Sequence, residues 1–425
     1  MIQHLKIVLY FTIARYFSFF ARIRLAKWKP RVVIITGSNG KTTALHLMAV
    51  QFGPRAKYSF HANSAFGIPF DILGLKRRNF SVFEWPALFL LAPLYAFKGP
   101  HPEKIYIVEA DGDRPGDGDF FGPFLKPEVC VWLSSSRTHS MLFESSVQSG
   151  EFTNVDDAIA HGFGRFLAHT SKLAVINADN PLIVENARDT SASLYEIRER
   201  ERLEAYTVST SGTTFRIQGE SYTVPYVLPK ETFYAIASSV KLAEYFGISP
   251  TTDLSGLVLP PGRSSLFRGI KNTTLLDSSY NANLESVVAI IHMAEALPGE
   301  KWLVLGDLIE QGKLEQEEHE RLGRIVAGSD FKRTILVGPR LRKYTKPVLE
   351  ENGKHVESFI SPKEALEYLL SELSGGLPGQ GEILVFKGAR FLEGIIEHLL
   401  QDYADVGHLC RREHVWVTRR KNFGL

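Results

Sequence analysis

The chain has 425 residues, of which 44% are hydrophobic and 23% charged. This composition is typical of a soluble globular protein, and the length predicts more than one domain. The formal net charge of +2 gives no case for nucleic-acid binding. The only cysteines, Cys130 and Cys410, exclude a disulfide framework and favour a reducing cytoplasm. We therefore expect a cytoplasmic monomer.

Two apolar segments lie in the first hundred residues. The first, "IVLYFTIARYFSFFA" (7–21), is interrupted by Arg15 and lies within an N-terminal helix predicted over 1–30; the second is "WPALFLLAPLYAF" (85–97). Both are shorter than the roughly 20 residues that span a bilayer. Two interpretations stay open: peripheral contact with a membrane interface, which basic flanks and aromatic residues favour, or packing on the globular body.

Between Lys29 and Asn177, short apolar runs alternate with helical patterns. The predicted strands are 32–35, 105–108, 129–133 and 173–176. Such alternation predicts a mostly parallel sheet covered by helices. Alternating stretches within 205–227 are typical of antiparallel strands, and a helix is predicted over about 230–246.

The prolines and glycine of "LVLPPGRSS" (257–265) indicate a boundary. A second α/β series follows, with strands near 274–276, 302–305, 334–337 and 383–386. The predicted fold class is α/β: a domain with a central, mostly parallel sheet, followed by a Rossmann-like α/β domain. The expected segments are an apolar helix (1–30), the first α/β domain (31–256), the C-terminal domain (257–404) and a solvated basic tail (405–425).

A glycine-rich turn joins the first predicted strand to a helix. In "TGSNGKTT" (36–43), Gly37 and Gly40 would let the backbone curl around phosphates at a helix N-terminus. Lys41 supplies a mobile positive charge and Thr42 a hydroxyl ligand for phosphate-bound Mg²⁺. The predicted nucleotide-binding residues of this turn are Gly37, Ser38, Asn39, Gly40, Lys41, Thr42 and Thr43. The turn predicts ATP as cofactor, with Mg²⁺, and makes 31–256 the expected P-loop ATPase, or ATP-binding, domain.

Further polar residues follow the other predicted strands of the first half. Glu109 ends one strand, and His139 follows the next. A carboxylate and an imidazole facing the turn would hold a second Mg²⁺, so the predicted metal ligands are Thr42, Glu109 and His139. The predicted catalytic residues are Lys41, Glu109 and His139. In "NADNP" (177–181), Asn177 and Asp179 fit either a local turn or a nucleotide-side loop.

In the second half, three strands each end in polar residues. They are Asp277, Tyr280, Asn281 and Asn283 in "LLDSSYNANLES", Asp307 and Glu310 in "VLGDLIEQG", and Lys387 and Arg390 in "VFKGAR". Strand ends of one parallel sheet meet at one edge, so these groups would form one rim. Zinc has no support, because neither a His-Glu-x-x-His nor a Cys-x-x-Cys pattern occurs.

These motifs together resemble the Mur ligase family, and within it the D-alanyl-D-alanine-adding branch. The matching stretches are "TGSNGKTT", "EADGDRPGD", "NADNP", "LPPGRSS", "DSSYNANLES", "GDLIEQG" and "FKGAR". The resemblance implies an ADP-forming ligase of peptidoglycan synthesis that activates a carboxylate as an acyl phosphate. It implies a cell-wall peptide precursor and an amino acid or dipeptide amine as substrates.

Site roles also follow from the resemblance. It assigns Arg263, Asp277 and Asn281 to the nucleotide. The implied substrate residues are Asn63 and Ser64 in the loop "HANSAFGIPFDILG" (61–74), Arg114, Lys387 and Arg390.

The sequence departs from the family in three places. The family's uridine-binding N-terminal domain has no counterpart in the thirty residues before the P-loop. Phe163, with His161 nearby, stands where the family has a lysine that becomes carbamylated. "ETFYA" (231–235) replaces an expected His-Asn-x-x-Asn segment.

Two alternatives therefore stay open. One is a related ligase or amidating enzyme acting on a lipid-linked or folate-type substrate. The other is a non-catalytic nucleotide-binding scaffold.

Overall fold

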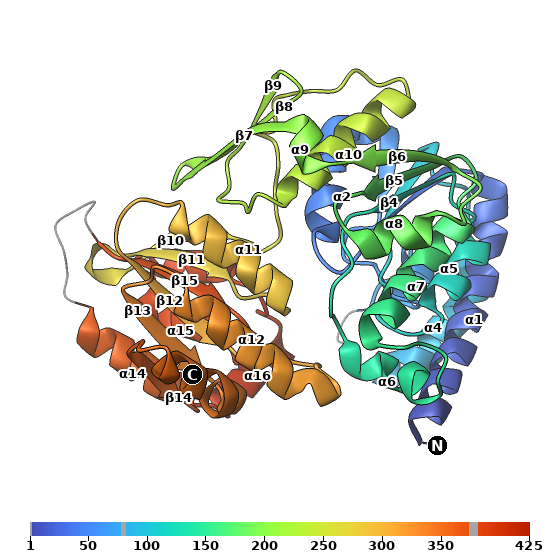
Figure 1. Ribbon diagram of the computed structural model, residues 1–425. Coiled ribbons are helices and arrows are strands. Elements are labelled where there is room, and N and C mark those ends of the chain that lie inside the picture. Colours follow the sequence, from blue (N-terminus) through green and yellow to red (C-terminus); the bar gives the residue numbers. More distant parts are fainter. Residues whose placement is uncertain (1, 78–81, 374–380) are drawn as a thin grey trace. The chain divides into compact units, whose positions relative to one another are not determined.

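The computed structural model describes residues 2–77, 82–373 and 381–425 (Figure 1). The chain forms two compact units that are not contiguous in sequence: the first comprises 1–136, 145–202 and 234–251, the second 137–144, 203–233 and 252–425. The predicted domains are contiguous instead, and their borders stay predictions.

The first unit is built on a six-stranded parallel sheet. Its strands, in spatial order, are β2 (Ala56–Tyr58), β3 (Ile105–Glu109), β1 (Arg31–Thr36), β4 (Val129–Trp132), β5 (Leu173–Asn177) and β6 (Ser193–Ile197). The unit's helices are α1 (Ile2–Trp28), α2 (Lys41–Phe52), α3 (Gly67–Leu73), α4 (Trp85–Ala96), α5 (Asp117–Leu125), α7 (Val155–Ala168), α8 (Pro181–Ala187), α9 (Glu199–Arg202) and most of α10 (Thr232–Tyr245). Helix α6 (Ser140–Gln148) is divided between the units.

The strand order of this sheet reverses between β1 and β4. The connection from β1 leads to β2 on one side, and the connection from β4 leads to β5 on the other. In open α/β sheets, ligands bind outside the carboxyl ends of the strands at such a switch point. The turn after β1 therefore lies where the topology favours a binding site.

The second unit contains two sheets. The antiparallel sheet consists of β7 (Leu203–Ser209), β8 (Gly212–Ile217) and β9 (Glu220–Val224). The larger sheet has the order β10 (Ser265–Arg268), β11 (Thr274–Ser278), β15 (Ile383–Lys387), β12 (Lys301–Gly306), β13 (Arg333–Val337) and β14 (Val356–Phe359), with only the β10–β11 pair antiparallel among its described strands.

Helices cover both faces of the larger sheet. Because alternate side chains of a strand point to opposite faces, Leu303 and Leu305 join a core with α11 (Leu284–Glu295) and α12 (Glu315–Ala327), whereas Trp302 and Val304 join a core with α14 (Pro362–Glu372) and α15 (Leu392–Leu399). Helices α13 (Lys346–Glu351) and α16 (His414–Lys421) complete the unit. The α/β prediction with two sheets is confirmed.

The C-terminal segment corrects the expectation of a solvated tail. Arg420 is 4% exposed, and its guanidinium lies 3.5 Å from a carboxylate oxygen of Glu393, which is fully buried on α15. Arg411 forms a second ion pair with Glu393 at 3.3 Å. The basic residues thus anchor α16 to the unit, because a buried carboxylate requires positive partners.

The two apolar N-terminal segments form helices that pack on the first unit. On α1, Ala14, Phe17 and Ala21 are fully buried, and the Phe17 ring packs against Phe70 of α3 and Phe89 of α4. This supports packing on the globular body for one face of α1. None of the helices within the described residues is sufficiently long and apolar to cross a membrane.

Candidate functional site

The turn between β1 and α2 has the backbone that the P-loop motif predicts. Gly37 has φ +129°, and a Cβ there would lie 2.8 Å from the Ser134 carbonyl oxygen. Gly40 has φ +84° and precedes α2 as its N-cap residue, without a side-chain cap among the described residues. Both positions require glycine, since other residues rarely adopt these angles. The result is a helix N-terminus of the kind that favours an anion.

The loop after β4 holds this turn in place. The Ser134 hydroxyl accepts a hydrogen bond from the Asn39 amide at 2.8 Å, and the Ser38 hydroxyl donates to the Ser136 carbonyl at 2.9 Å. In return, the Ser136 amide donates to the Ser38 hydroxyl at 2.9 Å. The predicted loop residues Ser38 and Asn39 are therefore fixed across the switch point. Ser134 and Ser136, the partners of this turn, were not predicted from the sequence. The run of three serines after β4 was the one signal for them.

Lys41 is held by charge and by its own loop. Its Nζ donates to the Gly37 carbonyl at 2.6 Å and lies 3.3 Å from Asp111 Oδ1. Burial would lower the pKa of Lys41, but the carboxylates of Asp111, Asp113 and Glu109 outweigh it and raise the pKa. Burial also raises the pKa of Asp111. A phosphate entering the loop would compete with Asp111 for the ammonium group.

Thr42 and Glu109 meet beside the loop. The Thr42 hydroxyl lies 2.9 and 3.1 Å from the two carboxylate oxygens of Glu109. The Glu109 amide donates to the Ser59 hydroxyl at 2.9 Å, which fixes the end of β3. A hydroxyl and a carboxylate are oxygen ligands that suit Mg²⁺. Within the described residues, no cluster of three His, Cys, Asp or Glu side chains could hold a metal by itself.

Asp117 is a further buried carboxyl group, and it contacts Arg114. The sequence alone did not connect Tyr10, Arg114 and Asp117. The guanidinium of Arg114, a predicted substrate residue, stacks 4.5 Å from the centre of the Tyr10 ring of α1, and its amide donates to Asp117. Asp117 is buried at the start of α5, and burial raises its pKa to about 8 against the opposing charge of Arg114.

We expect Asp117→Asn to flatten the pH dependence of folding stability. In the unfolded chain the carboxyl loses its proton near pH 4, whereas the folded protein keeps it up to about pH 8. Raising the pH between these values therefore favours unfolding of the wild type, by up to about 1.4 kcal/mol per pH unit. We would measure the free energy of unfolding in urea at pH 5 and pH 8. Relative to the wild type, the variant should be more stable at pH 8 than at pH 5. An unchanged difference between the two proteins would contradict this, and exposed Asp189→Asn serves as the control.

Phe163 fills the place where the family lysine is expected. Its ring is fully buried on α7 and packs 6.1 Å from the Trp132 ring, centroid to centroid. A Cβ at position 112 would lie 2.6 Å from the Phe163 ring, so the ring has room because residue 112 is glycine. His161, two residues earlier on α7, is exposed. Phe163 offers no ligand, and a carbamylated lysine has no counterpart at this position.

His139 lies in the second unit, not with Thr42 and Glu109 in the first. Its ring Nδ1 forms an ion pair with Glu310, and the Met141 amide donates to the Glu310 carbonyl at 3.2 Å. His139 has φ +50° and Glu310 φ +63°, both in the left-handed region. A metal site formed by His139, Thr42 and Glu109 stays a prediction.

The other predicted residues of the first unit make local contacts. The Asn63 carbonyl accepts the Asp111 amide at 3.0 Å, and the Ser64 hydroxyl accepts the Gly67 amide at 3.1 Å. Loop 61–74 thus adjoins the Lys41 partner, although its substrate role stays a prediction.

"NADNP" forms a hydrogen-bonded turn. The Asn177 side chain accepts the Asp179 amide at 3.0 Å, while Asp179 Oδ2 accepts the Tyr234 hydroxyl at 2.5 Å. Tyr234 belongs to "ETFYA", so this segment fastens α10 to the turn. The nucleotide role of Asn177 and Asp179 stays a prediction.

In the second unit, Asp277 and Lys387 lie at adjacent strand ends. Lys387 Nζ donates to the Asn281 carbonyl at 2.7 Å, and Asp277 accepts the amide and hydroxyl of Ser279. Burial, with the positive charge of Arg263, lowers the pKa of Lys387 to about 7 against the attraction of Asp277. Burial raises the pKa of Asp277.

Arg390 is fixed by a buried carboxylate one strand further along. Its Nε donates to Asp307 Oδ2 at 2.8 Å, and Asp307 Oδ1 accepts the amides of Arg340 and Leu341. Strands β11, β15 and β12 are neighbours, so the predicted rim of three polar strand ends forms on one sheet. Its predicted roles toward nucleotide and amine stay predictions.

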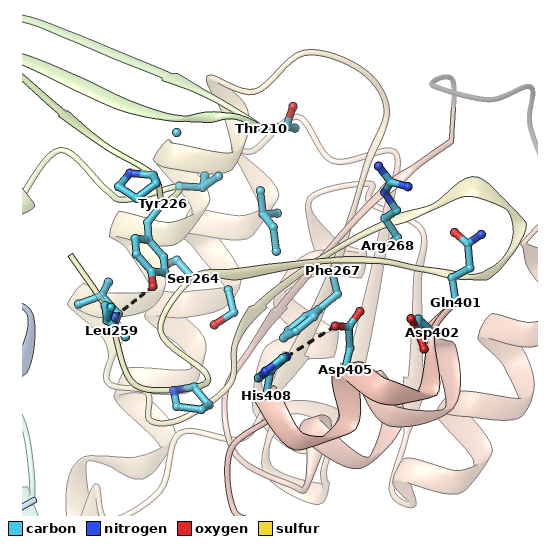
Figure 2. A pocket seen from close by; sticks show the side chains of 17 residues that line it. Thr210, Tyr226, Leu259, Ser264, Phe267, Arg268, Gln401, Asp402, Asp405 and His408 are labelled. Atoms are coloured by element: carbon cyan, nitrogen blue, oxygen red, sulfur yellow. Dashed lines mark hydrogen bonds and ion pairs between the residues drawn. The ribbon is translucent and has the colours of Figure 1, made fainter. Parts of the chain in front are cut away.

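A cavity of about 1140 Å³ lies elsewhere in the second unit (Figure 2). Tyr226, Phe267 and Arg268 line it, and Asp405 and His408 form an ion pair at 3.6 Å along its edge. Its lining contains none of the predicted site residues. The cavity therefore shares no residue with the P-loop.

The fold and motifs define a chain similar to the Mur ligases. Residues 262–390 match the family model of the Mur ligase, glutamate ligase domain. Over 408 residues the chain is 24% identical to the UDP-N-acetylmuramoyl-tripeptide–D-alanyl-D-alanine ligase of Bacillus subtilis strain 168, covering 90% of this chain and 78% of that protein. The resemblance to the D-alanyl-D-alanine-adding branch is thereby confirmed.

Solved structures of the same branch share the fold. The MurF ligase of Thermotoga maritima in complex with ADP has a TM-score of 0.72 at 20% identity, covering 92% of this chain and 84% of that one. MurF from Acinetobacter baumannii also has a TM-score of 0.72 at 20% identity, covering 92% and 79%.

Proposed function

We propose that this chain is an ATP-dependent, ADP-forming ligase that joins a carboxylate to an amine. The observation that carries the proposal is the loop after β1, where Lys41 faces Asp111 and Thr42 faces Glu109 at the sheet's switch point. The similarity to MurF ligases, one of them solved with ADP, supports ATP as the phosphoryl donor.

The proposed reaction has two steps. A carboxylate oxygen attacks the γ-phosphorus of ATP, the bond to the bridging oxygen breaks, and an acyl phosphate and ADP form. The amine nitrogen then attacks the acyl carbon, inorganic phosphate leaves with the former carboxylate oxygen, and the nitrogen loses a proton. Lys41 would neutralise charge on the phosphates during transfer. Thr42 and Glu109 would hold Mg²⁺, which supplies further charge neutralisation when bound.

The substrates proposed are those named for the relatives. The carboxylate is the tripeptide of a UDP-N-acetylmuramoyl precursor, and the amine is D-alanyl-D-alanine. On this proposal Lys387 and Arg390 lie near the amine, and Arg263, Asp277 and Asn281 contact the nucleotide. We propose a cytoplasmic site of action, where these precursors and ATP occur together.

The test is incubation of the full chain with ATP, Mg²⁺ and both substrates, with the product identified by mass spectrometry. We expect the condensed peptide and one ADP per product, and neither when either substrate is omitted. ATP binding without product would instead favour a lipid-linked or folate-type carboxylate, or the scaffold alternative that Phe163 motivates. The two are separated by ADP release with a lipid-linked or folate acceptor, since a scaffold releases none.

A further inference from the structure

Helix α4 leaves a row of large apolar side chains uncovered. Leu90, Leu94 and the C-cap residue Phe97 are 74%, 66% and 69% exposed. Their spacing of four and three residues places them on one side of the helix, while Leu88, Ala92 and Ala96 are buried on the other. We call these three exposed residues the α4 stripe.

Helix α1 lies beside the α4 stripe and adds basic residues to it. The Tyr16 hydroxyl donates to the Phe89 carbonyl at 2.7 Å, and the Lys27 ammonium lies 4.5 Å from the centre of the Phe97 ring. Figure 1 shows the two helices side by side. The exposed residues of α1 at helical spacing include Arg15, Phe19 and Arg22. The Arg22 guanidinium also lies 5.9 Å from the centre of the Phe124 ring of α5. Exposed basic and apolar side chains thus occur together on α1 and α4.

The two helices of this face supply no negatively charged side chain, because neither α1 nor α4 contains an aspartate or glutamate. Of the acidic residues on adjoining elements, Glu84 lies 3.5 Å from Arg77, and Asp119 pairs with Arg165 at 2.7 Å. A surface of aromatic, aliphatic and basic groups whose two helices supply no carboxylate is complementary to an anionic lipid surface.

We propose that the α1–α4 face binds the surface of an anionic membrane. The buried sides of both helices pack on the protein, while the α4 stripe enters the headgroup region and Arg15, Arg22, Lys27 and Lys98 meet lipid phosphates. The contact is with one leaflet and involves no spanning helix. This proposal does not depend on the proposed ligase activity, which is measured with soluble substrates.

The test is co-sedimentation of the full chain with vesicles of phosphatidylcholine alone or mixed equally with phosphatidylglycerol. We expect binding to the anionic vesicles that weakens as salt is added. The triple variant Leu90→Ser, Leu94→Ser, Phe97→Ser should reduce the partition coefficient at least about 10-fold, because its apolar insertion is lost. The double variant Arg15→Glu, Arg22→Glu should lose the preference for anionic vesicles.

Matched controls keep the result interpretable. Leu194→Ser and Val415→Ser remove exposed apolar side chains outside this face and should leave binding unchanged. All substituted side chains are exposed, so thermal unfolding should be close to that of the wild type. Absence of wild-type binding, or equal binding by the triple variant, would overturn the proposal. So would vesicle-free dimerisation that the triple variant abolishes, since the stripe would then cover a second copy of the chain.

Discussion

Replacing Lys41 by alanine is expected to lower the rate of ATP-dependent amide formation by about 100- to 1000-fold. The ammonium group is the cation of the loop after β1, held at 2.6 Å from the Gly37 carbonyl and 3.3 Å from Asp111. Its loss removes positive charge where the transferred phosphoryl group would carry negative charge. Single-turnover product formation with saturating ATP measures the effect.

The control for Lys41→Ala is Lys172→Ala, which removes an exposed lysine of the same unit. It should retain the wild-type rate. Folding of Lys41→Ala is expected to survive, because burial already raises the pKa of Asp111 and a proton can replace the lost cation. A folded Lys41→Ala protein within a few-fold of the wild-type rate would contradict the assigned role.

Arg420→Ala is expected to destabilise the second unit by about 3 kcal/mol or more. Glu393 is fully buried, and the guanidinium of Arg420 is its partner on the side of Oε1. Arg411 would remain at 3.3 Å from Oε2, but Oε1 makes no hydrogen bond within the described residues. The free energy of urea unfolding measures the loss.

The neighbouring Arg419 provides the matched control. It is exposed on α16 and stacks 4.8 Å from the Trp416 ring, so Arg419→Ala should cost less than about 1 kcal/mol. Equal effects of the two substitutions would show that Arg420 does not hold the C-terminal helix. A further variant, Glu393→Gln with Arg420→Met, removes both charges and should be less destabilised than Arg420→Ala.

The sequence predicted the central strands of the two six-stranded sheets and missed their edges. Strands β1, β4, β12 and β15 are buried on both faces, so they read as continuous apolar runs. The four strands not predicted, β2, β6, β10 and β14, are the edges of the two sheets. Their sequences, such as "AKY" and "VESF", are short and partly polar, as exposed edges require.

Site residues were predictable where a motif fixes the backbone and not where chain topology joins distant segments. Gly37, Lys41 and Thr42 follow from one local pattern. The pairing of Lys41 with Asp111 depends on the register of β1 with β3, which the sequence alone does not give. The Tyr10–Arg114 contact joins residues 104 positions apart through the packing of α1.

The packing of the basic C-terminal tail could not be predicted from the sequence for a different reason. "CRREHVWVTRRK" has the composition of a solvated end, and charge runs usually are solvated. The glutamate that recruits Arg411 and Arg420 lies on α15, where "LEGIIEHL" reads as an ordinary amphipathic helix. Only the fold shows that Glu393 faces inward and requires these partners.

The most direct test of the proposed chemistry follows the fate of a carboxylate oxygen. The tripeptide substrate is labelled with ¹⁸O in its terminal carboxylate and converted with ATP and D-alanyl-D-alanine. The acyl phosphate account predicts one ¹⁸O atom in each inorganic phosphate released, together with ADP. Label recovered in AMP, or phosphate without label, would contradict it.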